Sequence, residues 1–233
     1  MQQTSVWTRW APPATRNLIV INILLWLASM ALLRHGIDLD SLFGLHYFAA
    51  SDFHLHQLLT YGLLHSRAGL DHVLSNMFAL WMFGSSIERL WGSKRFLIYY
   101  FICGISAGLM QELSWLYELG DLSAYSGVAT EQGVIPVASY MNQLITIGAS
   151  GSVFGILLAF GVIFPNVRIY IYFLFPMKAK YFVLLYGLLE LFLGVSNTGG
   201  SVAHFAHLGG MIGGLILILL WRKKGELPND YYH

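Results

Sequence analysis

A serine among small residues is the feature of this chain that points most directly to chemistry. Residues 148–155 read Gly-Ala-Ser-Gly-Ser-Val-Phe-Gly and open an apolar stretch that we expect to be a helix. Gly148 and Gly151 let neighbouring backbone approach Ser150, and N–H groups at a helix N-terminus favour a developing negative charge. One interpretation of the pattern is therefore a nucleophilic serine with an oxyanion site beside it.

The same stretch also has a purely structural interpretation. Gly151 and Gly155 are four residues apart in an apolar segment, a spacing typical of the packing face of a membrane helix. On this stretch alone, packing is the better interpretation. Residues elsewhere in the chain must decide between the two.

The most informative partner is His207. A serine hydroxyl becomes a good nucleophile only when a base removes its proton, and histidine is the usual base. Gly210 and Gly214 continue the helix face of His207 and would let that helix come close to Ser150. By itself His207 would be read as a structural histidine bonding a backbone carbonyl. Together with Ser150 it favours catalysis, because ionisable groups within a membrane are functional candidates by default.

Other residues could fill these roles less well. His204 is three residues nearer the helix start, and we expect it to lie too shallow to be the base. Ser152 lies two residues from Ser150 and therefore points to a different helix face. Glu190, in a separate apolar run, is read as an interhelical hydrogen-bonding group with no part in this site. With no other carboxylate at hand, we expect a Ser-His dyad rather than a triad.

Three further side chains are candidates for supporting roles. His72 and Asn76 are four residues apart on one helix face, so both could donate to an oxyanion alongside the backbone N–H of Ser150. Phe154, one turn beyond Ser150, could stack on the imidazole of His207. The structural alternatives are interhelical hydrogen bonds for the first two, worth about 1 kcal/mol or less, and plain packing for Phe154.

The composition places these residues in a membrane protein of one domain. Of 233 residues, 56% are hydrophobic and 11% are charged, and the formal net charge of +1 gives no nucleic-acid footprint. The single cysteine, Cys103, excludes an intramolecular disulfide. His46, His54, His56 and His65 show no metal-ligand spacing. We therefore expect no metal and no cofactor.

Six apolar runs are mostly close to the roughly 20 residues that span a bilayer. They fall at about 18–35, 70–91, 96–117, 149–165, 179–195 and 201–221. The predicted fold class is an all-α bundle of six transmembrane helices, formed by residues 18–222 between cytoplasmic tails at 1–17 and 223–233. Residues 169–175, next to Pro176, are read as an interfacial linker.

The basic residues support this count, because Lys and Arg gather on the cytoplasmic side of a membrane. With six spans and both termini inside, 11 of the 13 Lys and Arg residues are cytoplasmic, and only Arg34 and Arg67 lie outside. Two long outer loops follow, at about 36–69 and 118–147. Ser150 is 15 residues before Pro165, roughly 22 Å of helix, so it lies a short way below the outer boundary, at the level of His207.

These residues resemble the motifs of the rhomboid family of intramembrane serine proteases, over about residues 18–221. The motifs are Gly-Ala-Ser-Gly at 148–151, His-Leu-Gly-Gly at 207–210 with Gly214, and His72-x-x-x-Asn76. The resemblance implies that Ser150 forms the acyl-enzyme, that His207 acts as base and acid, and that His72, Asn76 and the Ser150 N–H hold the oxyanion. One departure, His56-Gln57 where many members have Trp-Arg, concerns the membrane anchoring of the first outer loop and not the chemistry.

The function implied is hydrolysis of a peptide bond in or near the transmembrane segment of a membrane protein. The partners would be such substrates and the lipid bilayer, and the fifth helix with residues 196–200 would move to admit a substrate. We expect a multi-pass protein of a prokaryotic plasma (inner) membrane with cytoplasmic termini. Two alternatives remain: a catalytically silent relative that binds transmembrane clients, and a small transporter or channel.

Overall fold

The computed structural model of the chain describes residues 10–120, 122, 125–130, 133–171, 175–196 and 203–227. Some predicted features lie outside these ranges. They are most of the 196–200 loop, the first two residues of the sixth apolar run, and the outer parts of both predicted tails.

Helices account for most of the described chain and coincide with the six apolar runs, which confirms the predicted all-α fold class. They are α2 (Pro13–Leu33), α5 (Asp71–Ala79) continuing through the π-helical turn η2 (Leu80–Gly84) into α6 (Ser85–Trp91), α7 (Ser93–Leu119), α9 (Ser150–Ile163), α10 (Ala179–Val195) and α11 (His204–Lys223). Within the described residues, α2, α7 and α11 are long and apolar enough to cross a membrane. That all six stretches cross stays a prediction.

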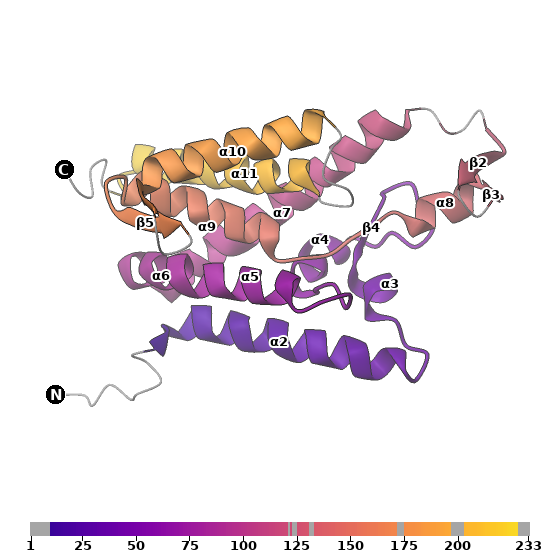
Figure 1. Cartoon of the computed structure of the whole chain (residues 1–233), viewed down its shortest axis with the longest axis horizontal. Coiled ribbons are helices and arrows are strands. Elements are labelled where there is room, and N and C mark those ends of the chain that lie inside the picture. Colours follow the sequence, from indigo (N-terminus) through magenta and orange to yellow (C-terminus); the bar gives the residue numbers. More distant parts are fainter. Residues whose placement is uncertain are drawn as a thin grey trace.

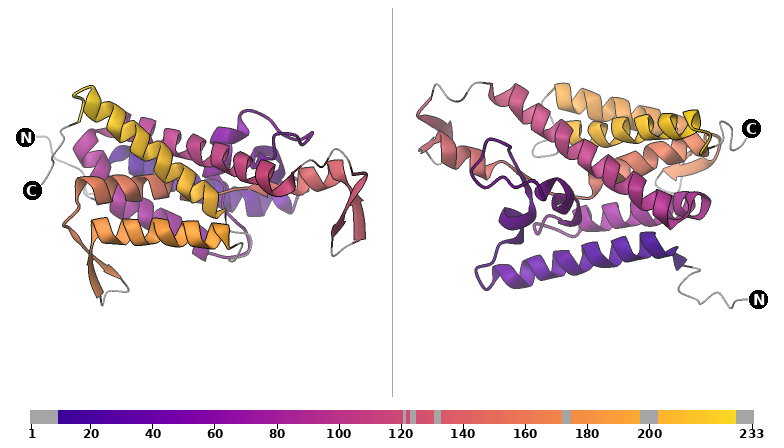
Figure 2. Two further views of the ribbon diagram at one scale, coloured as in Figure 1. Left: turned by 90° about the horizontal axis from the view of Figure 1, so that it is seen from above. Right: turned by 180° about the vertical axis from the view of Figure 1, so that it is seen from behind.

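The central helix is α9. It contacts α5, α7, α10 and α11, and 11 of its 14 residues are buried. Figure 1 shows α2 along one edge of the bundle and α10 with α11 along the other. In Figure 2, α7 runs obliquely across the bundle. The first residue of α9 is therefore surrounded by helices, and side chains from several of them can reach it.

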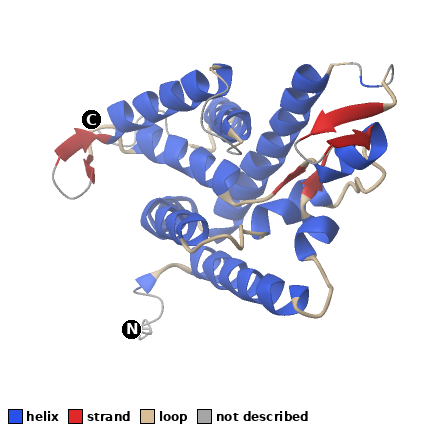
Figure 3. Cartoon of the chain, turned by 45° about the vertical axis from the view of Figure 1, so that its right-hand side comes forward, coloured by secondary structure: helices blue, strands red, loops and turns tan. Residues whose placement is uncertain are grey.

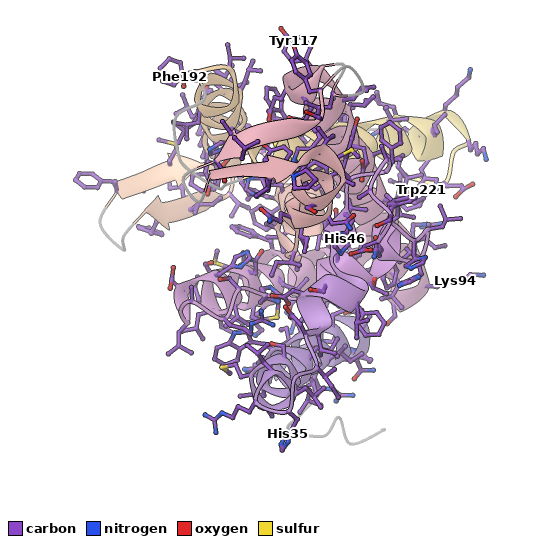
Figure 4. All side chains as sticks on the ribbon, turned by 90° about the vertical axis from the view of Figure 1, so that its right-hand side faces the viewer. His35, His46, Lys94, Tyr117, Phe192 and Trp221 are labelled. Atoms are coloured by element: carbon purple, nitrogen blue, oxygen red, sulfur yellow. The ribbon has the colours of Figure 1, made fainter. Side chains whose placement is uncertain are left out.

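The outer surface of the bundle is apolar, as expected for helices in lipid. Leu184 and Phe192 on α10 are 58% and 67% exposed, and Tyr117 on α7 is 89% exposed. Phe192 and Tyr117 project from the periphery in Figure 4. Such a surface would be an aggregation liability in water, so it identifies a protein of the membrane.

Short antiparallel strand pairs lie at the ends of the bundle (Figure 3). They are β1 (Leu45–His46) with β4 (Ile145–Thr146), β2 (Gly127–Thr130) with β3 (Gly133–Pro136), and β5 (Arg168–Ile171) with β6 (Phe175–Lys178). The β1–β4 pair joins the two predicted outer loops just before Ser150. Of residues 169–175, predicted as a linker, residues 169–171 lie in β5 and residue 175 begins β6; the others lie outside the described residues.

The predicted outer loops also contain short helices. These are α3 (Leu39–Phe43), α4 (Gln57–Thr60) with the 3-10 turn η1 (Tyr61–Leu63), and α8 (Val137–Gln143). Gln57, the departure from the rhomboid pattern, is fully buried at 0% exposure. Its Oε1 accepts the N–H of His54 at 3.1 Å and its Nε2 donates to the carbonyl of Asp52 at 2.9 Å. Gln57 therefore holds this loop together from within.

A buried carboxylate fastens α2 to the rest of the bundle. Glu88 of α6 accepts the backbone N–H of Ala14 at 2.8 Å and that of Thr15 at 2.7 Å, and it also accepts the hydroxyl of Ser93 at 2.6 Å. The first N–H groups of a helix have no acceptor within the helix, and a negative charge is favourable at that end. Glu88 thus caps α2 from a different helix.

Candidate active site

Ser150 and His207 come together at the N-terminal ends of two packed helices. Ser150 is the first residue of α9 and is half-buried, while His207 lies in the first turn of α11 and is 8% exposed. The Oγ of Ser150 is 2.9 Å from the Nε2 of His207, a hydrogen-bonding distance. The two residues are 57 positions apart in the chain, so only the folded bundle can form this pair.

Glycines make the close approach of these helices possible. A Cβ at Gly210 would overlap the backbone carbonyl of Gly151, so α11 lies directly against α9 at that level. A Cβ at Gly151 would meet Ala107, and one at Gly214 would meet the hydroxyl of Tyr99, both on α7. Gly210 therefore allows α11 to contact α9 directly. Gly151 of α9 and Gly214 of α11 allow each of these helices to pack closely against α7.

The backbone just before Ser150 requires glycine. Gly148 has φ of +137°, a conformation that L side chains rarely adopt. Its N–H donates to the carbonyl of Tyr61 at 3.0 Å, and a Cβ there would lie 3.0 Å from the Nε2 of His72. The chain thus enters α9 close to His72, where the first N–H groups of the helix lack intrahelical acceptors. This is an environment suited to an anion.

His72 and Asn76 differ in how they relate to this corner. The Nδ1 of His72 accepts the N–H of Ser66 at 3.2 Å, so the neutral ring carries its proton on Nε2, the atom that faces Gly148. Asn76 is buried, and its Nδ2 donates to the carbonyl of His72 at 2.8 Å. The structure therefore aims a donor of His72 at the site, whereas the hydrogen bond of Asn76 lies within α5.

Glu190 corrects the expectation that no carboxylate belongs to this site. Its Oε2 is 2.9 Å from the Nδ1 of His207 and 2.7 Å from the Nδ1 of His204. The sequence predicts Glu190 only as an interhelical hydrogen-bonding group outside this site. The available signal was an ionisable residue inside an apolar run, which marks a functional candidate. His204, expected to lie too shallow to be the base, shares the carboxylate of Glu190 with His207.

Phe154 and Ser152 occupy the positions expected from the sequence, one against the His207 ring and the other on a different face of α9. The ring of Phe154 is stacked on that of His207, with centroids 4.2 Å apart and planes 6° apart. Ser152, the rival nucleophile, donates its hydroxyl to the carbonyl of Tyr100 at 2.9 Å and is buried against α7. Ser152 therefore faces away from His207.

The side chains of Glu190, His204 and His207 are also of the types that bind metals. Their ligand atoms lie within 4.8 Å of one another, the one such group within the described ranges. A site of two histidines and a glutamate is compatible with Zn²⁺. In this structure the two rings bond to the same carboxylate oxygen, so hydrogen bonds already satisfy these atoms.

His65 lies behind His72 in the loop that precedes α5. The ring centroids of the two histidines are 5.1 Å apart, and the side chain of His65 is almost fully buried. Burial, assisted by the neighbouring His72, lowers the pKa of His65 to about 3. His65 is therefore neutral at physiological pH and packs beside His72 as an uncharged ring.

Comparisons with known proteins agree with the motifs. The sequence model of the Rhomboid domain matches residues 52–224. The chain is 31% identical to RHOMBOID-like protein 12, mitochondrial, of Arabidopsis thaliana, over 67% of this chain and 43% of that protein. It is 28% identical to Putative rhomboid protease YdcA of Bacillus subtilis, over 73% of this chain and 69% of that protein. It is 30% identical to Rhomboid protease GluP of Bacillus subtilis, over 68% of this chain and 24% of that protein. The chain thus matches less than half the length of two of these relatives.

Proposed function

The chain belongs to the rhomboid family, and from this membership we propose that it is a serine protease that cleaves membrane-protein substrates in or near a transmembrane segment. It is an integral membrane protein with an apolar helical bundle. The observation that carries the proposal is the 2.9 Å contact between the Oγ of Ser150 and the Nε2 of His207. Nucleophile and base within hydrogen-bonding reach are what acyl transfer requires.

The reaction has two stages. His207 accepts the Ser150 proton at Nε2 as Oγ attacks the carbonyl carbon of the scissile peptide bond. The tetrahedral intermediate collapses, the C–N bond breaks, and His207 returns its proton to the leaving amine. A water molecule, deprotonated by His207, then attacks the ester carbonyl carbon. The ester C–O bond breaks, the acid product leaves, and His207 returns the proton to the Oγ of Ser150. No redox step and no cofactor enter this sequence.

The negative charge on the carbonyl oxygen would be stabilised at the start of α9. The N–H groups of Ser150 and Gly151 lie in the first turn of that helix, and the Nε2–H of His72 faces the same corner. Preorganised donors of this kind contribute several kcal/mol when a site is shielded from water. Asn76 would join them by donating a hydrogen bond to the oxyanion from its second side-chain N–H, while the first keeps its bond to the His72 carbonyl.

We also propose six membrane spans with both ends of the chain cytoplasmic, in a prokaryotic plasma membrane. The start of α2, the α6–α7 turn, the β5–β6 hairpin and the end of α11 lie at one end of the bundle (Figure 1). The helix ends and hairpin there carry Arg16, Arg89, Lys94, Arg95, Arg168, Lys178, Lys180, Arg222 and Lys223. Such a basic end is typical of the cytoplasmic side, and it leaves Ser150 near the outer side.

Reconstitution in liposomes with a generic transmembrane substrate tests the proposal. We expect wild-type protein to cleave the substrate, and Ser150→Ala and His207→Ala to abolish cleavage while remaining folded and inserted. Ser152→Ala is the matched control and should retain activity. A fluorophosphonate probe should label Ser150 in the wild type. Retained cleavage in the Ser150 or His207 variant would refute the assignment, and an inactive, unlabelled wild type would favour a silent client-binding relative.

A further inference from the structure

Glu190 joins the fifth apolar helix to the candidate base. It is the carboxylate within α10, it is 4% exposed, and α10 lies beside α11. Its Oε2 is 2.9 Å from the Nδ1 of His207, whose Nε2 is 2.9 Å from the Oγ of Ser150. A continuous hydrogen-bonded chain of carboxylate, imidazole and hydroxyl therefore runs across three helices.

We propose that Glu190 is a positioning residue for the reaction, which selects the tautomer and orientation of His207 and thereby makes Ser150–His207–Glu190 a hydrogen-bonded triad. This inference rests on the proposed protease function. An ionised carboxylate accepts hydrogen bonds and cannot donate them, so the ring beside it must carry its proton on Nδ1. The lone pair of neutral His207 then lies on Nε2, facing the hydroxyl that it must deprotonate.

The geometry leaves His207 little freedom to adopt another arrangement. Phe154 covers one face of the ring at a centroid distance of 4.2 Å, and Glu190 holds its Nδ1 edge. When the imidazole takes the Ser150 proton it becomes a cation, and a carboxylate at 2.9 Å that is itself only 4% exposed compensates that charge. Glu190 is thus placed to act on the transition state, although it touches no reacting atom.

His204 makes the second bond to the same oxygen. Its Nδ1 is 2.7 Å from Oε2 of Glu190, and an acceptor-only carboxylate requires a proton there as well. His204 and His207, about one helical turn apart on α11, therefore both donate to the carboxylate and hold it in position. His204 would therefore hold Glu190 in place, but its loss leaves the bond between Glu190 and His207 possible.

The test is Glu190→Gln in reconstituted full-length protein. The amide keeps the shape of the side chain but can donate to Nδ1, which would move the ring proton to Nε2. We expect kcat to fall at least tenfold, toward the roughly 10⁴-fold loss caused by the corresponding Asp-to-Asn change in a serine protease triad, with KM within about twofold. Glu190→Asp should recover part of kcat. The fluorophosphonate labelling rate of Ser150, which needs no transmembrane substrate, should fall with kcat.

The matched control is Glu112→Gln. Glu112 is a buried carboxylate of α7 that accepts the N–H of Phe48 at 2.9 Å, apart from the site. We expect this variant to keep the wild-type kcat. His204→Gln should retain much more activity than Glu190→Gln, since His204 acts only on Glu190.

Several outcomes would overturn the proposal. Wild-type kcat and labelling rate in a folded Glu190→Gln would do so directly. A change confined to KM, or equal losses in Glu190→Gln and Glu190→Asp, would indicate a structural role. Loss of wild-type activity in EDTA with recovery on adding Zn²⁺ would mean that the cluster binds a metal. The protease proposal fails separately, when the wild type neither cleaves substrate nor labels at Ser150.

Discussion

The phenyl ring of Phe154 lies flat on the imidazole of His207, with 4.2 Å between centroids and 6° between planes. Both residues are buried, and Phe154 comes from the same helix as Ser150, one turn further along. The Phe154 ring therefore fixes the plane of the His207 imidazole, with Nε2 directed at the hydroxyl of Ser150.

Phe154→Leu should slow catalysis without unfolding the protein. Ring pairs of this kind contribute about 0.5–1.5 kcal/mol beyond area burial, so we expect kcat to fall about two- to tenfold in a liposome cleavage assay. Phe160→Leu is the control, because Phe160 packs on Phe83 away from His207. Equal effects from the two substitutions would mean that Phe154 contributes packing alone.

Asn76→Ala should reduce kcat by roughly 100- to 1000-fold, the range for loss of one oxyanion donor. KM should change little, because the donor acts on the transition state. Steady-state kinetics with a short transmembrane substrate measure both constants. An unchanged kcat would assign Asn76 to the hydrogen bond with the His72 carbonyl alone.

Gly210→Ala should disrupt both stability and activity. The added methyl would overlap the carbonyl of Gly151 and push α11 away from α9. Overpacking costs about 1–3 kcal/mol, and a displacement near 1 Å at reacting groups costs about 100-fold in rate. Thermal unfolding in detergent and cleavage assays report the two effects. Gly187→Ala is the control, since its methyl meets only the flexible end of Met211 at 3.2 Å, and it should remain active.

Acid should destabilise the protein through His65. Its folded pKa is about 3, below the ordinary 6.5, so the unfolded chain binds a proton more readily between those values. The stabilisation is complete above pH 6.5 and is lost progressively as the pH falls toward 3. Thermal unfolding of wild type and His65→Gln across this range provides the measurement. Their melting temperatures should differ in pH dependence, and parallel curves would contradict the prediction.

The helices, and the pairing of Ser150 with His207, could be predicted because they depend on apolar runs and on the spacing of glycines. An apolar run of about 20 residues forms a helix in lipid, since no water is present to satisfy its backbone. Ser150 and His207 were paired by their neighbouring glycines, because small residues allow close helix contact. The number of spans and the roles of the site residues stay predictions.

The role of Glu190 could not be predicted from the sequence, for a physical reason. Helix α10 is apolar nearly all round, with Leu189 and Leu191 beside Glu190, so its sequence does not indicate which side faces the bundle. The rotation of α10 depends on its packing against α9 and α11. The role of His204 could not be predicted for a related reason. The depth of His204 along α11 does not show that Glu190 of α10 can bond both His204 and His207.

The cap that Glu88 places on α2 has a consequence for how the protein is made. The N–H groups of Ala14 and Thr15 bond a carboxylate that follows 74 and 73 residues later in the chain. During synthesis α2 leaves the ribosome before α6. These two hydrogen bonds of α2 can therefore form only after the segment containing Glu88 has been synthesised.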